Sequence, residues 1–255
     1  MARMARRDEV RRIGVLLPSS NSVAEPSFSG ALPPGATLHV ARMRLANVEA
    51  ESIERVVEEI ETESRKLSDV DVDVIVLAAT APSSRKGLGY DRELIGRISA
   101  ASGKPATTAA TALNEALRAL AVARIALGAP WSEAVNRMTA AFIEQSGFQV
   151  VAHEALGLVR NLDIGLLDAA TGEEIARRVD RPEADAVMLA CGNWNVFGVI
   201  EPLERALGKP VLTTNQVSLW HALKIAGAAP VGGLGVLLRE HLGEGTAARS
   251  AASAA

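Results

Sequence analysis

The sequence predicts an α/β fold made of two pseudo-symmetric halves, each a parallel sheet flanked by helices, with the active site in the cleft between them. Three observations support this prediction. Short apolar runs alternate with amphipathic helical segments along the 255 residues, a pattern typical of parallel sheets covered by helices. Two segments repeat with the same internal spacing. Small and polar residues gather where the strands are expected to end, the edge at which open α/β sheets bind ligands.

The repeat is measured from the first strand-like run of each half. Ile13 opens one run and Ala79 follows 66 residues later (79 − 13), while Ile125 opens the other and Cys191 follows after the same 66 residues (191 − 125). A Gly-Lys-Pro sequence also recurs, at 103–105 and 208–210. Two halves related by a pseudo-twofold axis therefore present two facing strand ends. Only one of these ends carries a thiol.

The elements follow from the periodicity of the apolar residues. Helices are expected over 49–67, with Ile53, Val56 and Ile60 on one face, and over 132–146. Strands are expected at 12–17, 37–42, 74–78, 124–127, 149–155, 186–190 and 211–212. The first half is expected at 13–118 with a returning segment at 226–242, the second half at 119–225, and flexible tails at 1–11 and 243–255.

Composition narrows the class of function. Lysine and arginine number 27 against 30 aspartates and glutamates, with the signs interspersed, so no basic face for nucleic acid is expected. No apolar run reaches the length of a membrane span. The single cysteine cannot form an internal disulfide and the first residues do not resemble a signal peptide, which favours a cytoplasmic protein. Metal-ligand spacings and the dinucleotide glycine motif are absent, so neither a metal nor a cofactor is expected.

Cys191 is the first candidate for chemistry. It ends a strand-like run, Gly192 follows it, and a helix is expected to begin near Phe197, whose N-terminus would lower the pKa of the thiol. The alternative is a buried cysteine that only fills space. Thr80 lies opposite Gly192 by the same offset of 112 residues that separates Ala79 from Cys191 (192 − 80), so Thr80, with Ser83 and Ser84, is expected to give hydrogen-bond donors to an oxyanion. The alternative is a polar turn.

Ser19, Ser20 and Asn21 follow the first strand and precede a helix. Their hydroxyls and amide either cap that helix or hold a substrate carboxylate at its N-terminus. The four histidines, His39, His153, His221 and His241, are expected to be structural or exposed, although His221 lies near enough to Asn215 in the sequence to line the cleft.

Together these motifs resemble the aspartate/glutamate racemase superfamily, in the branch of maleate cis-trans isomerase and arylmalonate decarboxylase. The resemblance covers about residues 12 to 225. It rests on Ile13-Gly-Val-Leu-Leu-Pro-Ser-Ser-Asn21, Ala79-Thr80, Ala129-Pro-Trp-Ser-Glu-Ala-Val-Asn136, Asn161 and Ala190-Cys-Gly-Asn-Trp194.

The resemblance implies specific roles. Racemases and isomerases of the superfamily use two facing cysteines, whereas the decarboxylases keep only the second, and this chain has Ala79 in place of the first. The implied activity is a cofactor-independent decarboxylation of a small malonate, with Cys191 as the single proton donor. Trp131 stands where both relatives have tyrosine. The implied carboxylate or oxyanion ligands are Thr80, Ala81, Gly192, Asn193, Ser19, Ser20, Asn21 and Asn161, with Trp131, Pro82 and Trp194 as the pocket wall.

Three other activities stay open at this point. The residues Ser19, Ser20, Asn21 and Asn161 look more like the isomerase than the decarboxylase, which favours a maleate isomerase-like enzyme as the first alternative. A one-base racemase and a carboxylate-binding protein without turnover are the others. Each would take a small mono- or dicarboxylate, and homo-oligomers are common in the superfamily.

Overall fold

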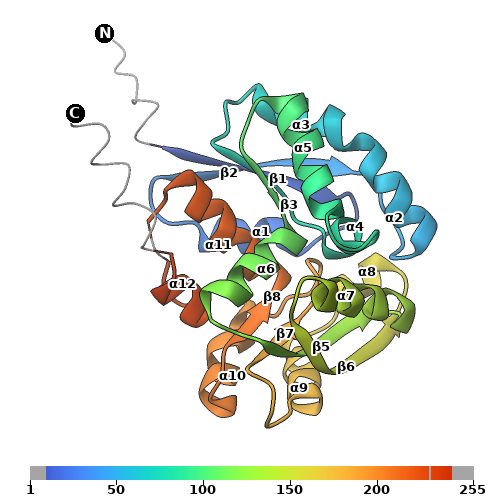
Figure 1. Cartoon of the computed structure of the whole chain (residues 1–255). Coiled ribbons are helices and arrows are strands. Elements are labelled where there is room, and N and C mark those ends of the chain that lie inside the picture. The colour runs from blue at the N-terminus through green and yellow to red at the C-terminus, as the bar shows by residue number, and fades with distance from the viewer. Residues whose placement is uncertain (1–9, 230, 243–255) are drawn as a thin grey trace.

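Two four-stranded parallel sheets, each flanked by helices, form the protein (Figure 1). The computed structural model describes residues 10–229 and 231–242. The strand orders are β2-β1-β3-β4 and β6-β5-β7-β8, so matching strands take matching places. The strands are β1 (Arg11–Pro18), β2 (Ala36–Met43), β3 (Val74–Leu77), β4 (Ala106–Thr108), β5 (Arg124–Trp131), β6 (Gln149–Leu158), β7 (Ala186–Leu189) and β8 (Val211–Thr213). The predicted fold class is confirmed.

The apolar runs became strands because both faces of each sheet are covered. All residues of β3 and β7 are buried, as expected for central strands of parallel sheets. Seven of the strands lie on the predicted runs. Strand β4 was not predicted, because its three residues include two threonines and give no apolar run.

An aspartate directly before a central strand of each sheet, Asp73 before β3 and Asp185 before β7, makes the same contact in both halves. The carboxylate of Asp73 accepts a hydrogen bond from the backbone N–H of Arg12 at 2.7 Å, and that of Asp185 accepts one from the N–H of Arg124 at 2.8 Å. The Arg124 side chain also donates to Asp185 and holds the pKa of that carboxyl at about 2. The repeat in the sequence therefore corresponds to the same aspartate-to-backbone contact in both sheets.

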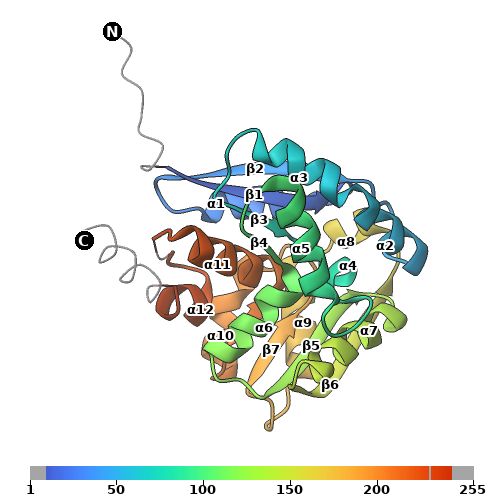
Figure 2. The same ribbon diagram turned by 45° about the horizontal axis from the view of Figure 1, so that its top comes forward.

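Helices cover both sheets and join the halves (Figures 1 and 2). The predicted helix over 49–67 is divided by a 3₁₀ turn, although its predicted face, including Ile53, Val56 and Ile60, is buried. The helices are α1 (Ala24–Ala31), α2 (Ala50–Val56), η2 (Val57–Glu59), α3 (Ile60–Ser68), α4 (Thr80–Ser84), α5 (Tyr90–Ser102), α6 (Ala109–Ala119), α7 (Glu133–Gln145), α8 (Asn161–Gly165), α9 (Ala169–Val179), η3 (Phe197–Val199), α10 (Ile200–Leu207), α11 (Thr214–Ala226) and α12 (Gly235–Glu240).

Helix α11 crosses between the halves. It follows β8 of the second sheet, yet it packs against α6 and against β1 and β3 of the first sheet. The division of the chain at residues 118 and 225 stays a prediction. Strand β1 begins at Arg11, and the tails expected at either end otherwise fall almost entirely outside the described residues.

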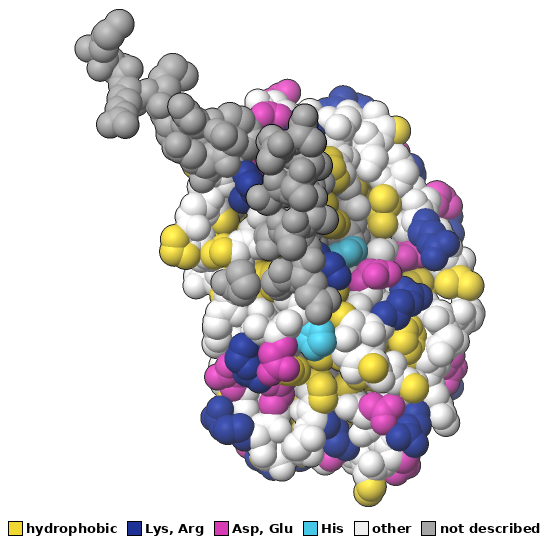
Figure 3. Space-filling view, turned by 60° about the vertical axis from the view of Figure 1, so that its left-hand side comes forward, with side chains coloured by type: hydrophobic (Ala, Val, Ile, Leu, Met, Phe, Trp, Pro, Cys, Tyr) yellow, Lys and Arg dark blue, Asp and Glu magenta, His cyan; other side chains and the backbone are white. Residues whose placement is uncertain are grey.

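Charged side chains are distributed over the surface. On the face shown in Figure 3, lysines and arginines are interspersed with aspartates and glutamates and do not gather into one basic patch. Within residues 10–229 and 231–242, no helix has the length and apolar character needed to cross a membrane.

Candidate active site

A small cavity lies between the carboxyl ends of β3 and β7, where the two halves meet. Its volume is about 40 Å³. Most of the residues predicted for the site line it. These are Asn21, Ala79, Thr80, Ala81, Pro82, Trp131, Asn161, Cys191, Gly192 and Asn193, with Pro18, Leu45, Val48, Ile53 and Ala78 completing the wall. Cys191 is the one ionisable side chain among these lining residues.

The two strand ends lie close together at Gly192. A Cβ atom placed on this glycine would lie 3.2 Å from the carbonyl oxygen of Ala78, at the end of the first sheet. It would also lie 3.2 Å from the side-chain oxygen of Asn215. A larger residue would push the halves apart, so the glycine permits the close approach that brings Ala79 and Cys191 into one cavity.

The Cys191 thiol is buried and its own environment keeps it protonated. Burial raises the pKa of Cys191 to about 12, and a hydrogen bond from the backbone N–H of Asn193, 3.4 Å from Sγ, offsets this only in part. The helical segment predicted near Phe197 is present, but the lowering of the Cys191 pKa expected from it was wrong. The first helical turn after Cys191 starts at Phe197 and is a 3₁₀ turn, so desolvation dominates the pKa.

The end of β3, unlike the end of β7, leads directly into a helix. Ala79 is the N-cap residue of α4, which begins at once with Thr80. Backbone N–H groups in the first turn of a helix favour a negative charge. The position suited to a thiolate therefore carries a methyl group, while the thiol lies where the neutral form is favoured.

Thr80 and Asn21 bring polar groups of the first half to the cavity. The Thr80 hydroxyl lies 2.8 Å from the hydroxyl of Thr214. The side-chain oxygen of Asn21 accepts hydrogen bonds from the N–H groups of Val23 and Ala24, at 3.0 and 2.8 Å, which fixes its orientation at the start of α1. Its amide nitrogen then lies 3.6 Å from a Cβ placed on Gly192, and both residues line the cavity.

Ser19 and Ser20 lie beside the cavity and do not line it. Both hydroxyls donate to the carbonyl oxygen of Leu45, and Ser19 also accepts from the N–H of Leu45 at 3.1 Å. Their direct role in carboxylate binding stays a prediction. The contacts favour an indirect role, because they hold the segment that covers the site.

Asn161 and Asn193 link the halves through their side chains. Asn161 donates to the Ser20 hydroxyl at 2.9 Å, and Asn193 donates to the Asn161 carbonyl oxygen at 2.6 Å. The side-chain oxygen of Asn193 accepts from the N–H of Ser22 at 2.8 Å. Both amides are thus held in place by the protein before any ligand binds.

The segment between β2 and α2 closes the cavity, and the sequence did not indicate this role. Leu45 and Val48 of this segment, with Ile53 of α2 beside them, form the cover. The backbone N–H of Val48 donates to the carbonyl of Val159 at 2.8 Å, which fastens the cover to the second half. A cavity of about 40 Å³ leaves little room for a substituted malonate, so we expect the cover to move outward when such a ligand binds.

The two tryptophans of the predicted wall differ in position. Trp131 lines the cavity and its indole N–H is buried without a hydrogen-bond partner, so it can donate to a ligand. Trp194 is equally buried but does not line the cavity. It lies near Gly172 of α9, where a Cβ would come 3.6 Å from its ring. Trp194 was predicted to form part of the pocket wall, but it is not among the residues that line the cavity.

His221 does not line the cavity either, contrary to one expectation. It lies on α11, where its Nδ1 is 2.8 Å from the Thr107 hydroxyl, and burial lowers its pKa from 6.5 to about 4. The unfolded chain binds this proton first as pH falls, so we expect the free energy of unfolding to drop by about 3 kcal/mol between pH 6.5 and 4. Urea denaturation at several pH values measures this drop. A His221→Gln variant should show a smaller drop, and an unchanged pH dependence would contradict this explanation.

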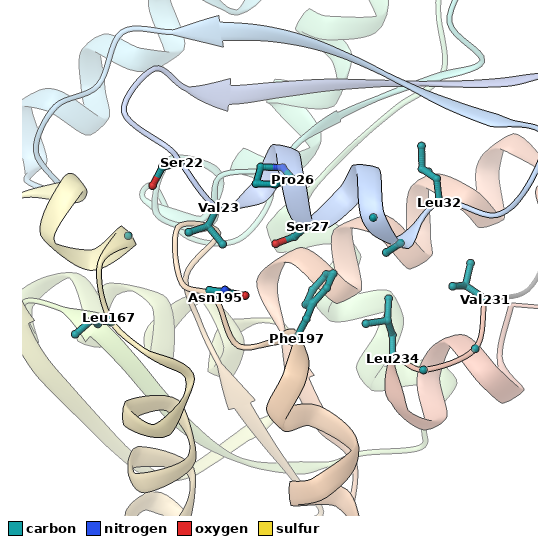
Figure 4. Close-up of a pocket in the computed structure, with 15 residues that line it drawn as sticks. Ser22, Val23, Pro26, Ser27, Leu32, Leu167, Asn195, Phe197, Val231 and Leu234 are labelled. Carbon is teal, nitrogen blue, oxygen red and sulfur yellow. The ribbon is translucent and has the colours of Figure 1, made fainter.

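A larger pocket of about 720 Å³ lies between α1, residues 231–234 and the turn after β7 (Figure 4). Ser22, Ser27 and Asn195 are its polar side chains, and Pro26, Phe197 and Leu234 are among the apolar ones. None of its lining residues is ionisable. It therefore lacks the acid or base that the smaller cavity has in Cys191. Across the described residues, no group of three or more His, Cys, Asp and Glu is placed to hold a metal ion.

Comparison with known proteins agrees with this geometry. The model of the arylmalonate decarboxylase family matches residues 13–238. Arylmalonate decarboxylase of Bordetella bronchiseptica is 28% identical over 84% of this chain and 90% of its own length. Maleate isomerase of Pseudomonas putida is 31% identical over 90% of this chain and 98% of its own length.

Solved structures of both enzymes superimpose on the chain. A maleate isomerase from Pseudomonas putida, a cysteine-to-alanine variant with maleate, gives a TM-score of 0.87 at 26% identity and covers 91% of this chain and 98% of its own. A liganded arylmalonate decarboxylase, with one glycine changed to cysteine and one cysteine to serine, gives 0.86 at 28% identity, covering 91% of this chain and 100% of its own. The chain is therefore similar to enzymes of two different reactions. It belongs to the arylmalonate decarboxylase family, in the branch of the aspartate/glutamate racemase superfamily that also holds maleate isomerase.

Proposed function

We propose that this protein is a cofactor-independent decarboxylase of small substituted malonates in which Cys191 is the single proton donor. The observation that carries the proposal is the pair of residues at the two strand ends. Ala79 and Cys191 line the same cavity, and only Cys191 can ionise. A reaction that needs one proton on one face fits this arrangement. A reaction that needs two facing thiols does not.

The steps require no other reagent. One carboxylate leaves as CO2 when its bond to the central carbon breaks, and the electron pair of that bond moves onto the retained carboxylate as an enediolate. The Cys191 thiol then gives its proton to the central carbon. The resulting thiolate regains a proton from water. With a pKa near 12, the Cys191 thiol is protonated when the reaction begins, and these reaction steps require that form.

Neutral hydrogen-bond donors are proposed to hold the retained carboxylate. Candidates are the Thr80 hydroxyl, the Asn21 amide, the Trp131 indole and the backbone N–H groups of Ala81 and Gly192. Donors that are fixed in advance and aimed at developing charge supply a large part of catalysis in such sites. The Asn21 amide is fixed by its two backbone contacts, which supports its place in this set.

A maleate isomerase-like reaction is the second candidate. The overall identity to maleate isomerase, 31%, supports it as well as the 28% identity to the decarboxylase supports the first proposal. Addition of a thiolate to the double bond would demand that the neutral Cys191 lose its proton in the buried cavity. The missing thiol at Ala79 leaves no second group there to accept it.

The deciding experiment compares two substrates with the same preparation. We expect CO2 release from phenylmalonate and no conversion of maleate to fumarate, followed by gas detection and by ultraviolet absorbance. Formation of fumarate without CO2 release from phenylmalonate would instead establish the isomerase. If neither substrate reacts but malonate raises the melting temperature, the protein binds carboxylates without turnover.

Substrate size is expected to depend on Ile53 and Val48. These two residues separate the cavity from an adjacent pocket of about 380 Å³ that Val135, Met138 and Val159 also line. An Ile53→Ala change should join the two spaces and raise kcat/KM for phenylmalonate relative to methylmalonate by about tenfold, roughly the value of two buried methylenes. Steady-state kinetics with both substrates measures the ratio. Met138→Ala, which enlarges only the outer pocket, is the control. If the wild type, Ile53→Ala and Met138→Ala give the same ratio of kcat/KM values, Ile53 does not limit substrate size.

A further inference from the structure

The hydroxyls of Thr80 and Thr214 form a buried hydrogen bond of 2.8 Å between residues 134 positions apart. Thr80 follows β3 of the first sheet, and Thr214 begins α11 directly after β8 of the second. Thr80 lines the cavity and Thr214 does not, so Thr214 lies behind Thr80 as seen from a ligand. Both residues are almost fully buried, with exposed fractions of 4% and 0%.

The hydrogen atoms of this pair can be arranged in two ways. Each hydroxyl has one hydrogen to donate and can accept from others. Among the described residues, neither hydroxyl has a second hydrogen-bond partner. When a carboxylate occupies the cavity, the favoured arrangement has Thr80 donating to the carboxylate and Thr214 donating to Thr80. Consecutive hydrogen bonds of this kind polarise and strengthen one another.

The next residue of α11 makes a matching contact with the other strand end. The side-chain amide of Asn215 donates to the carbonyl oxygen of Gly192 at 3.0 Å. The first turn of α11 thus contacts Thr80 of one half and Gly192 of the other. Its own N-cap is complete, because Thr213 and Gln216 form a capping box, so the Thr214 hydroxyl is not needed to cap the helix.

We propose that Thr214 is a positioning residue that orients the Thr80 hydroxyl toward the carboxylate on which negative charge develops. This inference rests on the proposed function, in which Thr80 holds the enediolate. An oriented donor gains most when the charge is largest, in the transition state, so loss of Thr214 should lower kcat more than it raises KM.

Thr214→Val removes the hydroxyl and keeps the shape of the side chain. With phenylmalonate and the full chain, we expect kcat to fall about tenfold while KM stays within about twofold, as for a donor that acts in the transition state. Thr214→Ser restores a hydroxyl and should keep most of the activity. Thr139→Val is the matched control, because Thr139 is as buried and donates to the Val135 carbonyl oxygen, away from the cavity. Its kcat should equal that of the wild type.

A double-variant cycle separates positioning from stability. If Thr214 acts through Thr80, the Thr80→Val, Thr214→Val protein should be no slower than Thr80→Val alone. If the losses in kcat of the two single variants multiply in the double variant, or if Thr214→Val is as active as Thr139→Val, the inference is overturned. If the wild type isomerises maleate and releases no CO2, the proposed function is wrong. The wild type, Thr80→Val, Thr214→Val and the double variant are then measured on maleate, and the ratios of their kcat values decide the role of Thr214.

Discussion

Replacing Cys191 by alanine is expected to lower the rate of CO2 release from phenylmalonate by about 10²- to 10⁴-fold, the range that a general acid contributes. Cys191 is the one ionisable group among the residues that line the cavity. Without it, the enediolate has no proton donor until the cover opens and water enters. The measurement is the steady-state rate of CO2 release with purified wild type and variant.

Two controls accompany this experiment. Cys191→Ser keeps the size of the side chain but offers a weaker acid, so its rate should also fall. The melting temperature of both variants should still rise with malonate, because the donors around the carboxylate are unchanged. Rapid CO2 release by Cys191→Ala would remove the thiol from the mechanism.

Introducing a cysteine at position 79 should have the second largest effect. Ala79 is the N-cap of α4 and faces the same cavity as Cys191. A thiol there is favoured as a thiolate by the first N–H groups of the helix. We expect Ala79→Cys to gain isomerase activity on maleate or racemase activity on 2-phenylpropionate, at least about tenfold above the wild-type background, since a thiolate near neutral pH is an effective nucleophile and base. A disulfide with Cys191 is the other expected product.

Ala190→Cys is the control for this gain. Ala190 is fully buried beside Cys191 but does not line the cavity. It should acquire neither activity. Maleate conversion and loss of optical rotation are measured before and after reduction with dithiothreitol. If Ala79→Cys shows no new activity and forms no disulfide, the two strand ends do not face each other as the repeat implies.

The repeat in the sequence predicted the most about the fold and the site. Equal spacing to Ala79 and Cys191 placed both residues at corresponding strand ends, because the spacing reflects two copies of one arrangement of strands. The contacts of Asp73 and Asp185 repeat with it. Strand β4 went unpredicted because three residues with two threonines give no periodicity.

The cover over the cavity could not be predicted from the sequence. Leu45 and Val48 belong to a segment without regular periodicity. That segment is held by backbone hydrogen bonds, such as the one from Val48 to Val159, more than a hundred residues away. Backbone contacts of this kind leave no trace in the identity of the side chains. The contacts of Ser19 and Ser20 with Leu45 could not be predicted for the same reason, since they depend on the position of this segment.

The pKa of Cys191 was expected to be lowered and is raised. The sequence indicated a helix near Phe197, and a 3₁₀ turn does begin there, but residues 191–196 are not helical, so no helix begins at the sulfur itself. Burial in a cavity without charged groups then determines the pKa. This change of sign supports proton donation by the thiol and opposes nucleophilic attack by a thiolate.

The stereochemistry of one product tests the central proposal most directly. Decarboxylation of 2-methyl-2-phenylmalonate gives 2-phenylpropionate, and the new C–H bond forms on the face that receives the proton. With Cys191 as the one ionisable side chain that lines the cavity, chiral chromatography should find one enantiomer almost alone. A racemic product from the wild type, or no product at all, would contradict a single proton donor at Cys191.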